Sequence, residues 1–230
     1  MLNILIMKQK LSEKIGKMKS VIKCNSGVAL TEFAYCLPIF TGLSLVGTEI
    51  TNLAMVNMRV SQVAMAVADN LSRAKQSVPL GLPQLREHDI NDAFIGANLQ
   101  GEDLGVFVNG RIIISSLQQN ASGGQWIAWQ RCKGQRVVNS SYGSQGTGAT
   151  GTSFAGMGTG TRRVTASPGT AIIFVEFTYS YRPIVAGSIL GPITLREETA
   201  FFVRDDRDLT QVYNPTPAAT PSLCTSFTAT

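Results

Sequence analysis

Apolar residues predominate from Val28 to Gly47, and the only carboxylate in this stretch is Glu32. About 20 apolar residues are enough to cross a bilayer as a helix. Further along, apolar side chains recur every three or four residues and so share one helix face. This stripe contains Ile50, Leu53, Val60, Ala64, Val67, Leu71 and Ala74, with Asn57 as a polar interruption. The pattern predicts one long helix over residues 28–76, transmembrane in its first half.

The two halves of this helix have different expected surroundings. The stripe in the second half would pack either on the C-terminal domain or on neighbouring helices. Pro38 lies inside the apolar half and lacks an N–H, so it should kink the helix or sit beside a local unwinding. Pro79, Gly81 and Pro83 predict that the helix has ended and that residues 77–88 form a linker.

Residues 89–213 alternate between helical and strand-like patterns. Asp89 is placed to cap a short helix through Leu99. Asn109-Gly110 is typical of a hairpin turn. The predicted strands, rich in β-branched and aromatic residues, are Gly105–Val108, Arg111–Leu117, Gln125–Cys132, Ala171–Tyr181 and Leu195–Arg204. The predicted fold class is therefore α+β: a long N-terminal membrane-spanning helix followed by a mixed domain with an antiparallel β-sheet.

Two further segments have a biased composition. Residues 139–169 form a long tract of glycine, serine and threonine with few apolar anchors. We expect this loop to be mobile, or ordered only against a partner. Residues 214–230 form a tail rich in proline and threonine, which we expect to be extended and to be pinned if Cys224 is bridged.

The positive charge of the chain is concentrated at its N-terminus. The chain has 20 lysines and arginines and 15 acids, a net charge of +5. Residues 1–27 hold six lysines and one acid, so without them 14 basic and 14 acidic residues remain (20 less 6, and 15 less 1). A basic N-terminal segment stays in the cytoplasm by the positive-inside rule. A neutral body lacks the basic face that nucleic-acid binding requires, so we expect no nucleic-acid partner.

The junction between the basic segment and the apolar run carries a specific arrangement. Gly27 precedes Val28, and a cut between them would make Glu32 the fifth residue of the mature chain. This arrangement resembles that of type IV prepilins, in which a basic leader ends in glycine before an apolar helix with a glutamate at its fifth position. Residues 1–27 would then be a prepilin-type leader. The alternative is a plain signal anchor, which also combines a basic N-terminus with about 20 apolar residues.

The resemblance can be narrowed to one family. Glu32-Phe33-Ala34 followed by Leu37-Pro38 is similar to the opening motif of TadE-like (TadE/TadG) proteins of tight-adherence, Flp-type pilus systems. Val175 to Pro183 resembles the late strand of that family, with its Tyr-x-Tyr-Arg-Pro ending. Two intermediate stretches, Asp89–Ile95 and Gln125–Cys132, also resemble the family. Cys36 departs from the usual aliphatic residue, but a thiol packs much like one.

This resemblance implies a non-enzymatic minor pilin or assembly factor of the bacterial inner membrane. Gly27 and Val28 would form the processing site for a prepilin peptidase, and Glu32, Phe33 and Pro38 would act in assembly. Its partners would be other pilin-like proteins, the inner-membrane assembly platform and the lipid bilayer. The N-terminus would be cytoplasmic and the domain periplasmic. The runner-up is an unprocessed single-pass envelope scaffold.

Cysteine placement fits export. Cys24 lies in the leader and Cys36 in the apolar run, which leaves Cys132 and Cys224 in the body. An oxidising periplasm permits a disulfide between these two, the alternative being two unrelated buried thiols. With no Cys-x-x-Cys and a single histidine, His88, the sequence predicts no metal site.

No motif indicates an enzyme or a cofactor. Gly156-Met157-Gly158-Thr159-Gly160 lacks the third spaced glycine of a dinucleotide-binding loop and the Gly-Lys-Ser/Thr of a Walker motif. Its composition is that of a low-complexity loop. We therefore predict neither catalytic nor cofactor-binding residues.

Overall fold

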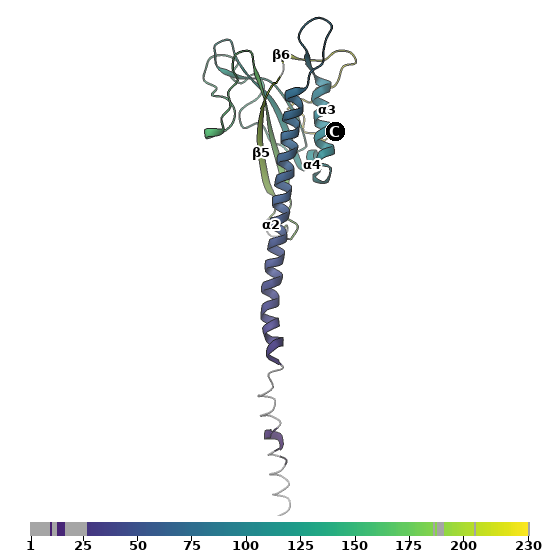
Figure 1. The fold of residues 1–230 in the computed structure, drawn as a ribbon, viewed down its shortest axis with the longest axis vertical. Helices are drawn as coiled ribbons and strands as arrows, with labels where there is room; N and C mark the ends of the chain where they lie inside the picture. Colours follow the sequence, from purple (N-terminus) through teal and green to yellow (C-terminus); the bar gives the residue numbers. More distant parts are fainter. Residues whose placement is uncertain are drawn as a thin grey trace, which may run out of the picture. The chain divides into compact units, whose positions relative to one another are not determined.

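The computed structural model describes residues 10, 13–16, 27–185, 187, 191–204 and 206–229. Most of the expected leader, including Cys24, lies outside the described residues. The chain divides into two compact units, Met1–Ile50 and Thr51–Thr230. The first unit holds the N-terminal part of helix α2 (Val28–Arg73), and the second unit holds the rest of α2 and the α+β domain (Figure 1).

Helix α2 begins at Val28, directly after Gly27, and ends three residues before the expected boundary at residue 76. The helix continues through Pro38 without a break, so the local unwinding offered as one alternative for this position is wrong.

The second unit confirms the predicted fold class. A four-stranded antiparallel sheet has the order β3-β2-β4-β5, and a separate two-stranded parallel sheet joins β1 to β6. After α2 the elements are β1 (Gln84–Arg86), α3 (Glu87–Gln100), η2 (Glu102–Leu104), α4 (Val106–Asn109), β2 (Gly110–Gln119), β3 (Gln125–Lys133), η3 (Gly160–Arg162), β4 (Ala171–Tyr181), β5 (Ile193–Phe202) and β6 (Asp208–Tyr213).

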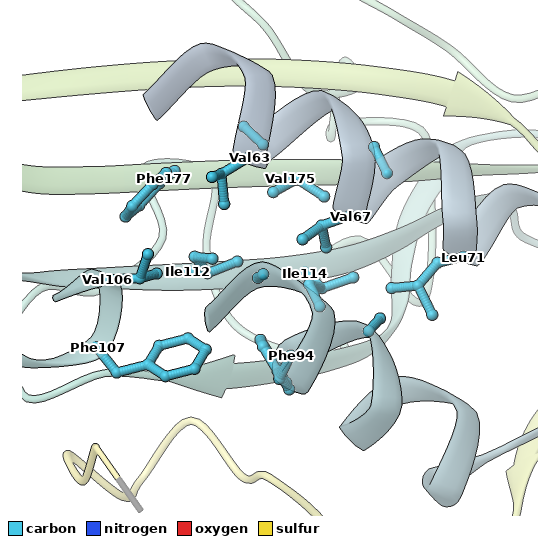
Figure 2. Close-up of a cluster of buried hydrophobic side chains, with 14 of the residues drawn as sticks. Val63, Val67, Leu71, Phe94, Val106, Phe107, Ile112, Ile114, Val175 and Phe177 are labelled. Carbon is cyan, nitrogen blue, oxygen red and sulfur yellow. The ribbon is translucent and has the colours of Figure 1, made fainter. Parts of the chain in front are cut away.

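One face of the sheet is covered by α3 and by the part of α2 in the second unit. Figure 2 shows side chains from α2 and α3 converging on those of β2 and β4. The core residues labelled there are Val63, Val67, Leu71, Phe94, Val106, Phe107, Ile112, Ile114, Val175 and Phe177. The stripe of α2 thus packs on its own domain, which was one of the two expected partners. Asn57 is exposed rather than part of the buried stripe.

The opposite face of the sheet is covered by the glycine-rich loop. Met157 is fully buried and Ala166 nearly so, and both pack on the sheet in a second core. The side chain of Gln125 in β3 accepts the Ala166 N–H at 2.7 Å and donates to the Ala166 carbonyl at 2.9 Å. The expectation that residues 139–169 are mobile, or ordered only by a partner, is therefore wrong, because the loop is anchored on its own sheet.

Several local expectations differ from the structure. The segment expected to be a linker, 77–88, contains β1 and the start of α3. Asp89 caps α3 from inside its first turn, where its carboxylate accepts the Arg86 N–H at 2.9 Å. The strand expected at Gly105–Val108 is wrong, because Gly105 has φ +58° and opens the short helix α4. Gly110 then starts β2 and makes no hairpin turn.

The C-terminal end of α2 is completed by a distant arginine. Helix ends leave carbonyl groups without intrahelical donors. Arg207, which is buried just before β6, donates from Nη1 to the carbonyls of Leu71 and Ala74, both at 2.8 Å. Burial lowers the pKa of this guanidinium to about 10. Residues near both ends of the domain therefore meet at this point.

Candidate functional site

The first half of α2 exposes large apolar side chains along its length. Leu30, Tyr35 and Ile39 are 71%, 77% and 64% exposed. The most apolar 18-residue window of the helix has a mean hydropathy of 1.5, and none of it is buried in the protein. Apolar surface left in water costs about 25 cal/mol per Å². This segment therefore requires an apolar environment that the described part of the chain does not supply.

The dimensions of the segment match a bilayer. Residues 28–47 would span about 30 Å at ~1.5 Å per residue, which is the thickness of a typical hydrocarbon core. Among the described residues, α2 is the one helix long and apolar enough to cross a membrane. This is consistent with a single-pass membrane protein.

Three threonine hydroxyls in and just after the segment are satisfied within the helix. The Oγ1 atoms of Thr31, Thr41 and Thr48 donate to the carbonyls of Val28, Leu37 and Ser44 at 2.8–2.9 Å. An unsatisfied polar group in hydrocarbon costs several kcal/mol, on the order of 2–7. Because these bonds are local, the three threonines can be placed in lipid without that cost.

The predicted processing and assembly residues lie together at the N-terminal end of this segment. Gly27 directly precedes the helix and Val28 is its first residue. Glu32 follows about one turn later, ~6 Å along the axis, and its side chain is exposed. A carboxylate near a helix N-terminus is favoured by the helix dipole. Phe33 and Pro38 are also exposed in the same stretch.

The predicted disulfide is present in the body. Cys132 of β3 is bonded to Cys224 of the tail, 92 residues later. The remaining described cysteine, Cys36, is a free and exposed thiol in the apolar segment.

The disulfide is one of several contacts that cover the outer edge of β3. The Cys132 N–H donates to the Ser222 carbonyl at 2.8 Å, and the Gly134 N–H donates to the Thr228 carbonyl at 3.0 Å. Farther along the same edge, the Ile127 N–H donates to the carbonyl of Thr147 at 2.9 Å. Tail and loop together satisfy backbone groups that an outer strand would otherwise leave open.

The side chain of Arg111, in β2, holds the tail in place through hydrogen bonds to its backbone. Its side chain is almost fully buried, and no carboxylate is bonded to it in the described part of the chain. Nη1 donates to the carbonyls of Gly134 and Ser226 at 2.9 and 2.8 Å, and Nη2 donates to that of Cys224 at 2.7 Å. The guanidinium also lies 4.1 Å from the centre of the Phe227 ring. Burial lowers the pKa of Arg111.

A buried ion pair joins the same strand to α3. Arg131 of β3 donates from Nε and Nη2 to both carboxylate oxygens of Glu87, and both side chains are buried. Removing one partner of such a pair leaves an uncompensated charge. The pair therefore fixes the start of α3 on the sheet.

Two glutamates hold the start of the glycine-rich loop on the other side of the sheet. Glu176 of β4 lies directly opposite Glu198 of β5. The Glu176 carboxylate accepts hydrogen bonds from Ser140 Oγ and from the Ser141 N–H. Glu198 accepts from Tyr142 Oη at 2.8–2.9 Å. Desolvation raises the pKa of Glu176, partly offset by the bonds from Ser140 and Ser141.

Sequence reasoning located the apolar segment and both cysteines but missed Arg111 and Arg131. Each arginine stands within a strand of mostly uncharged residues, Arg111 before three isoleucines and Arg131 after Trp129 and Gln130, with Lys133 as the other charge in β3. An isolated charge in such a strand is the signal that could have marked them. The described residues contain no group of three or more His, Cys, Asp or Glu side chains that could hold a metal ion.

No family model, no curated protein and no solved structure matches this chain. The class of protein is therefore defined by the fold itself: an α+β domain preceded in the chain by a helix that is able to span a membrane.

Proposed function

We propose that this chain is a pilin-like protein of the TadE type, which is held in the bacterial inner membrane by α2 and acts, without catalysis, in the biogenesis of Flp-type pili. Its leader would be removed between Gly27 and Val28 by a prepilin peptidase. The mature helix would then associate with other pilin-like helices and with the inner-membrane assembly platform. The α+β domain would lie in the periplasm.

The observation that carries this proposal is the N-terminal end of α2. The helix begins at the residue that the cut would expose, and Glu32, the single carboxylate of residues 28–47, follows one turn later in an exposed apolar segment. A carboxylate in that position can neutralise the new ammonium group of an adjacent helix. In a medium of low dielectric constant such a pair is strong when both charges are present and costly when one is missing.

The disulfide supports export of the domain. Structural disulfides persist in oxidising compartments such as the periplasm, and the bond from Cys132 to Cys224 closes a segment of 92 residues. The alternative function is an unprocessed envelope scaffold, which would use the same anchor and the same domain but would keep its leader.

Processing distinguishes the two functions. We expect N-terminal sequencing of the membrane-bound protein to give Val28 as the first residue. The variant Gly27→Leu should block the cut, because the scissile backbone must enter a narrow active site, and should leave a precursor longer by 27 residues. Gly42→Leu is the matched control, since a Cβ atom added at Gly42 meets no described atom of the protein within 4 Å. A leader retained in the wild-type protein would favour the scaffold.

The role of Glu32 can be tested with the thiol of Cys36, which is free and exposed in the same segment. We expect Glu32→Gln to be inserted and processed normally, because the helix only becomes more apolar. Crosslinks from Cys36 to neighbouring pilin-like helices should be lost, together with piliation. Glu102→Gln, at an exposed position in η2, is the control. Unchanged crosslinks and normal pili in Glu32→Gln would contradict the assembly role.

A further inference from the structure

Strand β5 is an outer strand of the four-stranded sheet with one edge unpaired (Figure 1). Its other edge pairs with β4 along its whole length, from Ile193 opposite Tyr181 to Phe202 opposite Ile172. Within the described part of the chain, no backbone group outside β4 is bonded to residues 193–202. The unpaired edge therefore presents a row of N–H and C=O groups, which is a template for another strand.

A hollow of about 400 Å³ lies beside β5. Five consecutive residues of β5, Arg196 to Ala200, line it. The lining also includes Val164 of the loop and Phe174 of β4, so the hollow lies on the loop-facing side of the sheet, next to the outer strand. Gly158, Thr159 and Arg162 of the glycine-rich loop form part of the opposite wall.

The charges around the hollow are unequal on the two faces of the sheet. Arg196 and Glu198 share one face, which also meets Arg162 of the loop. Glu198 already accepts the Tyr142 hydroxyl on its carboxylate. Neither arginine has an ion-pair partner among the described residues. Two arginines and one glutamate line this side of the hollow, a net charge of +1, whereas Glu197 points to the other face.

We propose that the free edge of β5 binds an extended strand of a partner protein, which adds to the sheet and directs acidic side chains toward Arg162 and Arg196. In binding of this kind, backbone hydrogen bonds supply the affinity and alternate side chains supply the specificity. The charge on the loop-facing side selects carboxylates. This inference concerns the domain alone and does not depend on processing or membrane insertion.

A second copy of the same chain is a poorer occupant of the edge. Two β5 strands pairing around a two-fold axis can be centred on Arg196, Glu197 or Glu198. The registers centred on Arg196 and on Glu198 place that residue directly opposite itself with no opposite-charge pair beside it, and like charges opposite one another destabilise a strand pair. The register centred on Glu197 has one like-charged pair but also places Arg196 opposite Glu198 in both directions. The run of three charges thus disfavours two of these three registers, while it leaves a complementary strand free to bind.

The probe is a seven-residue peptide, acetyl-Thr-Val-Glu-Val-Glu-Val-Thr-amide, added to the full chain in detergent micelles. Alternation places both glutamates on one face of the peptide. We expect it to slow hydrogen exchange of amides in β5 while leaving the already covered amides of β3 unchanged. Two matched peptides serve as controls, one with lysine in place of both glutamates and one with proline at the central valine.

Paired variants test the charge selection. We expect Arg196→Glu to weaken binding of the glutamate peptide about tenfold, the effect of losing one charge-assisted contact, and to improve binding of the lysine peptide. Unchanged exchange in β2 shows that the variant is folded. The proposal is overturned by any of three results: no added protection of β5 at millimolar peptide, equal binding of all three peptides, or protection of β5 by dimerisation before any peptide is added.

Discussion

Of the two outer strands of the sheet, β3 is covered by the tail and the glycine-rich loop, whereas β5 is left open. Along β3 the backbone donors of Ile127, Cys132 and Gly134 are all occupied, and a disulfide holds the covering tail in place. Along β5 no such covering is present in the described residues, and the edge carries consecutive charges instead. The comparison shows two ways to prevent uncontrolled strand pairing. Covering the edge with other segments also removes it as a binding surface. Placing charged side chains along the edge leaves its backbone groups available to a partner.

The largest effect should come from opening the covered edge. We expect the double variant Cys132→Ser and Cys224→Ser to lower the free energy of unfolding by about 4–5 kcal/mol on the chain-entropy account of a loop of this length. Denaturant titration measures the loss. Hydrogen exchange should accelerate at Cys132 and Gly134 but not in β5. The control is Cys36→Ser, which removes an unpaired thiol. Equal acceleration on both edges would mean that the edges are not independent.

A smaller loss should follow from removing the arginine under the tail. Arg111→Leu leaves the carbonyls of Gly134, Cys224 and Ser226 without a donor, so we expect a destabilisation of roughly 2–3 kcal/mol. The same substitution at the open edge, Arg196→Leu, should change stability by no more than about 0.5 kcal/mol. Thermal or denaturant unfolding of both variants checks this contrast. Similar losses would show that β5 is held by contacts of comparable strength.

The smallest effect concerns the pH dependence of stability that arises from Glu176, which lies in β4 opposite Glu198 of β5. Because the pKa of Glu176 is raised by desolvation, this carboxyl contributes stability at low pH that is lost as the pH rises through its folded-state pKa. We expect Glu176→Gln to flatten the curve of unfolding free energy against pH above the ordinary glutamate range. Glu102→Gln, at an exposed position, should leave the curve unchanged. A steeper decline in the Glu176 variant would reverse the assigned sign.

The sequence was most informative where periodicity extended over many residues. The apolar run, the stripe of α2 and strand β4 at Ala171–Tyr181 were located within a few residues of their observed bounds. The strands β1 and β6 were missed, because three and six mostly polar residues show little alternation. Their pairing, Gln84 opposite Asp208, depends on the approach of two distant segments.

Composition misled the interpretation of two glycine-rich regions. At Gly105–Val108 the apolar residues favoured a strand, but the positive φ of Gly105 turns the chain into α4. In the loop 139–169, the many glycines and serines suggested mobility. A few residues outweigh them: Met157 fills the second core, and Gln125 binds both backbone groups of Ala166. Sequence patterns show how many residues in a segment favour an ordered structure. They do not show which individual contacts are enough to anchor the segment.

The arginine that completes α2 has a consequence for the order of events during synthesis. The carbonyls of Leu71 and Ala74 obtain their donor from Arg207, so these hydrogen bonds cannot form until Arg207 has emerged from the ribosome. The tail that covers β3 arrives later still. At about 5–20 residues per second, the intervening 130 or so residues delay this contact by roughly 7 to 26 seconds. Until the tail arrives the edge of β3 is exposed as well as that of β5, and the nascent domain would be a client of a chaperone in the compartment where it folds.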